Sequence, residues 1–277
     1  MKTSTRFAGL VIMALAFLLV AGQRQAAAQS GGTLERVKQT KVLRDCVDPE
    51  YPPDVFKDKD GKFAGFGIEL AAQMAKALGA EVQYVETNWD GIIPSLLANK
   101  CDIAMTSMTP RPARALVVTF AKVYYPETMA LLVKAGDTRT TPEDFNKPDV
   151  KLCIQQGTLD EVIWKKFFPQ AQGTLLQSQT DCFLQVASGK VDGAPSDYPT
   201  TMAFTKAHPT QIKPVLSGLL GSVSAAPAIQ HNDLEFRVWV DEFFADMINS
   251  GDYAALYRKI VGYDVDIPHL MLERGNM

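Results

Sequence analysis

Arg114 and Asp197 have the clearest potential for chemistry among the charged side chains of this 277-residue chain. Arg114 follows the apolar segment 101–105, and its planar guanidinium can hold both oxygens of a carboxylate at once. Asp197 follows the apolar segment 191–194 and could accept hydrogen bonds from an ammonium group. Each also has a structural interpretation, since Arg114 could be a solvated charge at a helix start and Asp197 could cap the helix that Pro199 begins.

Hydroxyl and aromatic side chains occupy similar places, close to the ends of strand-like segments. Thr106, Ser107 and Thr109 lie just upstream of the arginine. Open α/β sheets bind ligands at the carboxyl ends of their strands, so these hydroxyls can add hydrogen bonds to a bound anion. Tyr51 and Trp89 lie in connections from a strand to a helix, where a ring can stack on a ligand. The alternative is that both rings belong to the core.

Strand and helix patterns alternate along the chain, which is typical of a doubly wound, mostly parallel α/β sheet. Apolar residues at helical spacing predict a helix over 68–78, and alternating apolar residues predict a strand over 81–85. The alternation breaks near the polar residues 136–140 and then restarts. The further predicted strands are 41–47, 101–105, 150–154, 174–176 and 191–194, and the further helices are 91–98, 158–167, 181–188, 199–207, 234–248 and 253–260.

The two halves of the chain repeat one another weakly, and each half carries two cysteines. Cys46 and Cys153 lie on the first strand of their halves, whereas Cys101 and Cys182 flank the helix that leads to a later strand. Four cysteines allow three pairings, or four buried free thiols. Neighbouring strands and their crossover helix meet in space, so we favour the pairs Cys46–Cys101 and Cys153–Cys182. The histidines are scattered and no Cys-x-x-Cys motif exists, so no metal and no cofactor is expected.

The N-terminus has the three-part layout of a secretory signal. A short cationic start precedes an uncharged apolar run over 7–22, and small residues follow for cleavage near Ala28. The alternative is a membrane anchor, but the run is shorter than the ~20 residues that a crossing needs. Gln23 stands where a lipoprotein would carry cysteine. We therefore expect a soluble mature protein of roughly 250 residues in an oxidising compartment, near the size at which one core splits into two.

Several segments resemble, in the same order, the family 3 extracellular solute-binding proteins of polar amino-acid ABC transporters. Each segment is weak alone, but together they cover nearly the whole chain from 42 to 262. They are DPEYPP at 48–53, GFGIELA at 65–71, NWDGIIPSL at 88–96, SMTPRPAR at 107–114, QGT at 156–158, GKVDG at 189–193, GDY at 251–253 and YRK at 257–259.

The resemblance implies a periplasmic binding protein-like fold of type II, with two lobes joined by two hinge crossings. The expected division is a signal peptide over 1–28, lobe 1 over 31–126 plus 228–277, and lobe 2 over 127–227. The implied protein is a periplasmic monomer that binds a free amino acid or a close derivative between its lobes. Its implied partners are an ABC permease and its ATPase at the inner membrane. The formal net charge of −3 argues against nucleic acid as a partner.

The family pattern also gives the candidate residues their roles. Arg114 would clamp the α-carboxylate with help from the upstream hydroxyls, and Asp197 would receive the α-ammonium. Thr158 would offer a hydroxyl and a helix N-terminus, Tyr51 and Trp89 would form walls, and Asp48 would meet a cationic or hydroxyl side chain. The sequence departs from the pattern twice, because Leu159 stands where a second hydroxyl is common and Gly67 where an acid is usual.

The main alternative is an enzyme on the same fold, a periplasmic cyclohexadienyl dehydratase. That group carries a loop like Asn-Pro-Gly-Gly-Thr-Asn and a stretch like Thr-Asp-x-x-Glu. The stretches here, 155–159 and 196–200, lack the second Gly, the Asn and the late Glu, which leaves no obvious general acid. A sensor module that passes its ligand state to a separate receptor is a third class. Basic, neutral polar and aromatic amino acids, and amino-acid conjugates, all stay open as ligands.

Overall fold

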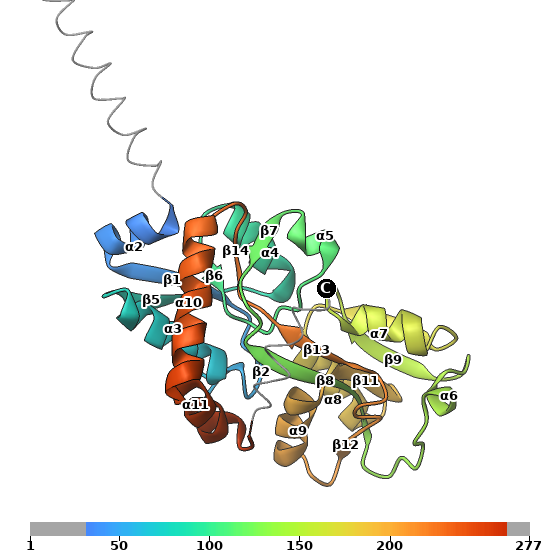
Figure 1. The fold of residues 1–277 in the computed structure, drawn as a ribbon. Coiled ribbons are helices and arrows are strands. Elements are labelled where there is room, and N and C mark those ends of the chain that lie inside the picture. The colour runs from blue at the N-terminus through green and yellow to red at the C-terminus, as the bar shows by residue number, and fades with distance from the viewer. Residues whose placement is uncertain (1–31, 265–277) are drawn as a thin grey trace, which may run out of the picture.

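The computed structural model describes residues 32–264, which form two α/β halves lying side by side (Figure 1). The predicted signal peptide, residues 1–28, lies outside the described residues, as does the segment 265–277. Among residues 32–264, no helix is long and apolar enough to cross a membrane.

The first half is built on a five-stranded sheet with the order β5-β1-β6-β14-β7. β1 pairs in parallel with β5 and β6, whereas β14 pairs antiparallel with β6 and β7. The strands are β1 (Val42–Val47), β5 (Glu81–Glu86), β6 (Ile103–Ala104), β7 (Val118–Phe120) and β14 (Ala228–Gln230), with a small sheet of β2 (Glu50–Tyr51), β3 (Val55–Lys57) and β4 (Phe63–Ala64). The helices are α2 (Thr33–Thr40), α3 (Phe66–Ala77), α4 (Trp89–Leu97), α5 (Pro112–Ala115), α10 (Leu234–Ser250) and α11 (Asp252–Val261).

The second half is built on a sheet with the order β10-β9-β11-β8-β12, in which β13 also pairs with β8. β9 pairs in parallel with β10 and β11, and β8 runs antiparallel to its neighbours. The strands are β8 (Tyr125–Lys134), β9 (Lys151–Gln155), β10 (Gln172–Leu176), β11 (Gly193–Asp197), β12 (Ile212–Val215) and β13 (Ser222–Ala225). The helices are α6 (Pro142–Phe145), α7 (Asp160–Phe167), α8 (Gln179–Ser188) and α9 (Tyr198–Ala207).

The chain passes between the halves through two adjacent segments. The start of β8 pairs antiparallel with β13, with Tyr125 opposite Ala225. Three residues beyond Ala225, β14 already belongs to the first sheet. The expected lobe boundaries at 126 and 227 fall beside this pair, and they stay a prediction about which parts move together.

The returning chain completes the core of the first half. Phe66 of α3 packs edge-on against Tyr253 and Tyr257 of α11, with ring centroids 5.3 and 5.1 Å apart. All three rings are buried, and the Tyr253 hydroxyl donates to the carbonyl of Tyr124. Aromatic pairs of this geometry stabilise a core beyond the burial of their area. The C-terminal helices therefore belong to the half that carries the N-terminal strands.

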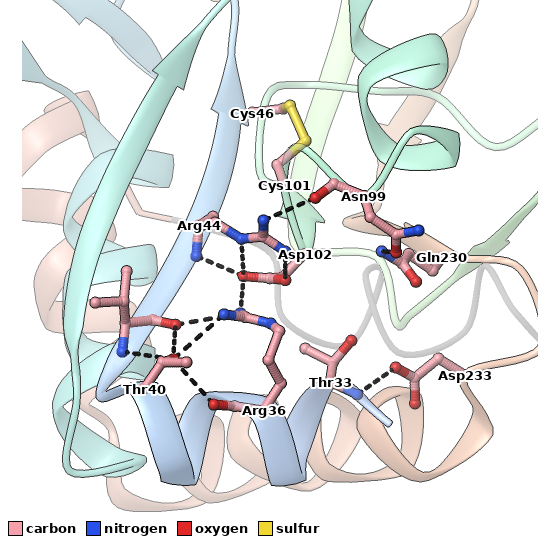
Figure 2. Close-up of polar contacts among 11 residues, drawn as sticks. Thr33, Arg36, Thr40, Arg44, Cys46, Asn99, Cys101, Asp102, Gln230 and Asp233 are labelled. Atoms are coloured by element: carbon pink, nitrogen blue, oxygen red, sulfur yellow. Dashed lines mark hydrogen bonds and ion pairs between the residues drawn. A yellow bond between two sulfur atoms is a disulfide. The ribbon is translucent and has the colours of Figure 1, made fainter. Parts of the chain in front are cut away.

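A buried carboxylate joins the first strand of this half to its later strand (Figure 2). Asp102 accepts from the backbone N–H of Arg44 at 2.7 Å and pairs with the Arg44 guanidinium at 2.7 Å. Arg36 of α2 donates to the same carboxylate, which explains why this helix packs beside β1. The side chain of Asp102 is only 1% exposed. Its two guanidinium partners compensate the charge that burial would otherwise make unfavourable.

The second half repeats this arrangement at Asp192. The carboxylate of Asp192 accepts from the backbone N–H of Lys151 at 2.8 Å, and Arg139 is its cationic partner at 3.1 Å. The segments 99–104 and 189–194 resemble each other weakly in sequence, and each carries an aspartate that links two strands. We call this contact the strand staple. The Asp192 side chain is 36% exposed, so this copy is the more solvated one.

The predicted α/β class, the order of elements and both disulfides are confirmed. Cys46 is bonded to Cys101 and Cys153 to Cys182, with Cα–Cα distances of 5.6 and 5.2 Å. The sheets are more mixed than the alternation predicts, because the strands that cross between halves join them antiparallel. The strand expected at 191–194 is observed as Gly193–Asp197, which makes Asp197 its last residue.

We expect Asp102→Ala to lower the free energy of unfolding by about 3 kcal/mol, because it leaves two guanidiniums without their partner. Asp192→Ala is the matched variant, and its more exposed pair should cost about 1 kcal/mol. Urea unfolding of both variants measures the difference. Equal losses would show that burial of the carboxylate does not set the strength of the staple.

Candidate ligand-binding site

A small cavity of about 30 Å³, partly open to solvent, lies between the halves. The predicted residues in its wall are Tyr51, Trp89, Ser107, Thr109, Arg114, Thr158 and Asp197. The other residues in the wall are Glu127, Met129, Leu159, Asp160 and Ser196.

The ends of the strands bring these residues together. Ser107 and Thr109 follow β6, and Trp89 opens α4 directly after β5. Asp197 ends β11, and Thr158 lies between β9 and α7. The carboxyl ends of parallel strands share one edge of a sheet, which is where open α/β folds bind ligands. The two sheets present these edges to the same cavity.

Arg114 is held by backbone carbonyls from both halves. Its Nη1 donates to the carbonyl of Thr109 and its Nη2 to the carbonyl of Gly157, both at 2.9 Å. The guanidinium carbon lies 5.2 Å from the centre of the Trp89 ring. Burial lowers the Arg114 pKa to about 10, so the side chain stays charged at neutral pH. A guanidinium has five N–H groups, so Arg114 can keep both bonds and still hold a carboxylate.

Asp197 combines both of the roles considered for it. Its Oδ1 accepts from the backbone N–H of Thr200 at 2.7 Å, which caps α9. The same side chain lies in the cavity wall. Burial raises the Asp197 pKa to about 6, against hydrogen bonds that lower it. The carboxyl is therefore mostly ionised at neutral pH and can receive a cation.

Thr158 lines the cavity, but its hydroxyl serves its own backbone. The Oγ1 donates to the carbonyl of Gln155 at 2.8 Å and accepts from the N–H of Asp160 at 3.1 Å. In this arrangement, the hydroxyl hydrogen is not directed at a ligand carboxylate. The second half therefore offers a bound carboxylate fewer hydrogen bonds at Thr158 than the sequence predicts.

Asp48 and Thr106 lie outside the cavity wall. Both are buried, and the backbone N–H of Asp48 donates to the Thr106 hydroxyl at 3.3 Å. Burial, with Glu50 nearby, raises the Asp48 pKa to about 8. Asp48 is then mostly neutral at pH 7, and its contact with a ligand side chain stays a prediction.

Sequence reasoning missed the contribution of the crossing strand. Glu127 and Met129 of β8 both reach the cavity. Residues two apart on a strand face the same side, so the pair follows from the strand period once β8 is recognised. Residues 127 and 129 directly follow the expected lobe boundary at 126, and their sequence gives no sign that they face a cavity.

A buried acid, Asp54, lies directly beside Gly67. The Asp54 carboxylate accepts from the backbone N–H of Gly67 at 2.9 Å, from the Ser107 hydroxyl, and from the Tyr124 hydroxyl at 2.7 Å. A Cβ at position 67 would lie 3.0 Å from the Asp54 Oδ1 and 3.0 Å from the carbonyl of Met105. Glycine at 67 therefore leaves room for Asp54, whose partner Ser107 has a left-handed backbone conformation with φ of 48°.

One backbone carbonyl collects three donors from the opposite half. The Gly157 oxygen accepts from Trp89 Nε1 at 3.2 Å, Arg111 Nη2 at 3.1 Å and Arg114 Nη2 at 2.9 Å. Gly157 has φ of 76°, and a Cβ there would lie 2.8 Å from a carboxylate oxygen of Asp90. Only glycine fits this approach without strain.

Glu50 forms a second bridge between the halves. Its Oε1 accepts from the Ser178 hydroxyl at 2.9 Å, and its Oε2 accepts from the backbone N–H groups of Gln179 at 2.6 Å and Thr180 at 3.3 Å. These donors form the N-terminus of α8, where the helix dipole favours an anion. The Tyr51 hydroxyl donates to Gln155 beside it. Together these contacts hold the halves in a closed arrangement.

Two α/β halves, two crossing segments and a cavity with walls from both halves define the class of two-lobed solute-binding proteins. A model of the bacterial extracellular solute-binding proteins, family 3, matches residues 43–267. The chain belongs to this family, as the sequence segments predict.

Named relatives are mostly binding proteins. A probable histidine-binding protein of Campylobacter jejuni is 32% identical over 174 residues, which cover 61% of this chain and 65% of that protein. The L-cystine-binding protein TcyJ of Escherichia coli is 27% identical and covers 91% of this chain and 94% of its own length. A cyclohexadienyl dehydratase of Pseudomonas aeruginosa is 24% identical over 72% of this chain and 75% of its own length.

Solved structures show the same architecture. An ancestral amino-acid-binding protein, described as a precursor of cyclohexadienyl dehydratase, superposes with a TM-score of 0.78. It is 36% identical and covers 83% of this chain and all of its own. The two-lobed fold of this chain is therefore the fold of known amino-acid-binding proteins.

We expect Glu50→Gln to raise the dissociation rate of a bound solute about fivefold, because a charged contact with a helix N-terminus contributes about 1 kcal/mol to closure. Glu81→Gln, at an exposed glutamate of β5, is the matched control. Stopped-flow tryptophan fluorescence measures both rates. An unchanged rate in Glu50→Gln would mean that the bridge does not help to hold the closed state.

Proposed function

We propose that this protein is the periplasmic substrate-binding component of an amino-acid ABC transporter. The observation that carries the proposal is the placement of Arg114 from the first half and Asp197 from the second in one cavity wall. These two charges match the carboxylate and the ammonium of a free amino acid. The family and the named relatives support the amino-acid ligand. The permease and ATPase partners, and the periplasmic location, follow from the family alone.

Opposite charges on opposite halves give a physical reason for closure. A ligand bound to the first half alone has its carboxylate on Arg114 and its ammonium in water. Closure brings Asp197 to the ammonium and removes water from both contacts. The closed state thus gains differential affinity for the ligand, which is what shifts the population toward it. A permease can then distinguish the loaded protein from the empty one by shape.

Binding without catalysis is part of the proposal. The dehydratase relative and the ancestral precursor show that related chains span both activities. The stretches 155–159 and 196–200 of this chain still lack the Gly, Asn and Glu of the enzyme pattern. The test below therefore includes the substrates of that enzyme.

We expect one or a few amino acids to raise the melting temperature of the mature protein, refolded to remove any bound ligand. A ligand at ~1,000 times its dissociation constant adds about 4 kcal/mol of stability, or roughly 8–16 °C at this size. The panel contains the common amino acids, ornithine, arogenate and prephenate. No shift with any amino acid in a folded sample would contradict the proposal. Conversion of prephenate or arogenate would favour the enzyme.

We expect Asp197→Asn to weaken amino-acid binding at least ~100-fold, because it removes one partner of a buried charge pair. Asparagine can still cap α9, so the melting temperature should change little. The sign with pH follows from the pKa of about 6 in the free protein. Below that pH, protonation of Asp197 should raise the dissociation constant by an additional factor of about ten per pH unit.

Calorimetry from pH 5 to 7.5 measures both effects. The additional pH dependence should be absent in Asp197→Asn. Normal affinity in this variant would remove Asp197 from the ligand site.

A further inference from the structure

The charges in the cavity wall do not balance for a simple zwitterion. The wall contains one cation, Arg114, and three carboxyl groups, those of Glu127, Asp160 and Asp197. The residue exposures of the three acids are 5, 5 and 7%. Within residues 32–264, no Lys, Arg or His forms an ion pair with any of the three. A buried carboxylate without a cationic partner is strongly unfavourable.

A neutral amino acid leaves part of this imbalance in place. Its carboxylate is matched by Arg114 and its ammonium by Asp197. Glu127 and Asp160 then still lack a cation inside the closed site. Asp160 is close enough to Arg111 for that guanidinium to lower its pKa, although burial dominates and raises it. The cation coupled to Glu127 is Arg114, which the ligand carboxylate would occupy, so Glu127 is the carboxyl with the greater need for a partner.

The surroundings of Glu127 are mainly acidic. Burial is the first cause that raises its pKa well above the usual range, and Asp197, Asp54 and Asp160 add to the effect. The nearby Ser107 hydroxyl lowers the Glu127 pKa, against these effects. The charged and titratable groups coupled to it come from β11 (Asp197), α7 (Asp160), the loop after β2 (Asp54), α5 (Arg114) and the start of the crossing (Tyr124).

Part of the wall is apolar and could contact the aliphatic part of a ligand side chain. Tyr51 and Trp89 pack with ring centroids 5.5 Å apart, and both rings are largely buried. Met129 and Leu159 add apolar surface from the second half. Aromatic faces also attract a cation that approaches them.

We propose that Glu127 receives a second positive charge of the ligand, so that the site selects amino acids with an ammonium or guanidinium side chain over neutral ones. This inference rests on the proposed function and names its substrate class. With such a ligand, Asp197 and Glu127 each have a cation, and Arg114 has its carboxylate. Binding also favours the ionised form of Glu127, so a cationic ligand should displace a proton that the empty site holds.

The test compares charged ligands with neutral relatives of the same shape. Calorimetry on the refolded mature protein measures arginine against citrulline, and lysine against norleucine. The expected result is a preference of about 100-fold or more for the cationic member of at least one pair. In Glu127→Gln, the preference should fall below ~10-fold. Glu143→Gln, at an exposed acid of α6, is the control and should keep it.

A second readout does not depend on the variant. Titrations in buffers of different ionisation enthalpy count the protons exchanged on binding. The wild-type protein should release a proton with the cationic ligand near neutral pH and release fewer with its neutral relative. Equal proton release for both members would overturn the role of Glu127, even if Glu127→Gln does not fold.

The outcomes separate this inference from the proposed function. Tight binding of neutral amino acids with no preference for cations overturns the cationic class but leaves the amino-acid-binding function in place. No binding of any amino acid by folded protein overturns both. A preference that survives Glu127→Gln keeps the substrate class but removes Glu127 as its determinant.

Discussion

The closed cavity depends on the carbonyl of Gly157. Trp89, Arg111 and Arg114 all donate to this one oxygen from the opposite half. The contact fixes the guanidinium that would clamp a carboxylate, and it also holds the aromatic wall and the second half together. A backbone carbonyl can approach so closely only because the residue that carries it has no Cβ. Asp197 and Glu127 line the same cavity as the guanidinium.

Each half of the molecule is stapled internally, whereas the halves meet through hydrogen bonds. Asp102 and Asp192 join the first and later strands of their sheets, and each half has its own disulfide. The bonds between halves, at Glu50, Tyr51 and the Gly157 carbonyl, are few and polar. Polar contacts of this kind can exchange with water when the halves separate, and stapled halves can separate without losing their own structure. Strength within the halves and reversibility between them suit a protein that must release what it binds.

The fold class, the disulfides and most of the cavity wall could be predicted from the sequence, because they depend on local sequence patterns. Periodicity located the helices, and the weak internal repeat paired the cysteines within halves. The rule that ligands bind at strand ends gathered most of the cavity wall. The residues that the sequence placed wrongly or left out depend on tertiary contacts. Glu127 enters the site from a crossing strand whose pattern says nothing about the cavity. Asp54 reaches the place that Gly67 leaves open from a separate loop. The hydroxyl of Thr158 is hydrogen-bonded within its own turn. Asp48 lies outside the cavity wall, and the sequence cannot show this because the packing of the whole lobe decides how deep a side chain lies.

The disulfides constrain the segments that make the hydrogen bonds between the two halves. Cys153–Cys182 ties β9, which leads to Gln155 and Gly157, to α8, whose first N–H groups receive Glu50. Cys46–Cys101 joins β1 to the residues just after α4. β1 leads to Glu50 and Tyr51, and Trp89 is the first residue of α4. Every bridge between the halves thus begins or ends on a segment that a covalent cross-link holds in register. The sheets have their own backbone hydrogen bonds, and the disulfides add a covalent link between each sheet and a segment that makes these contacts. Reduction of the two disulfides should therefore loosen the spacing of the contacts between the halves while the sheets keep their own hydrogen bonds.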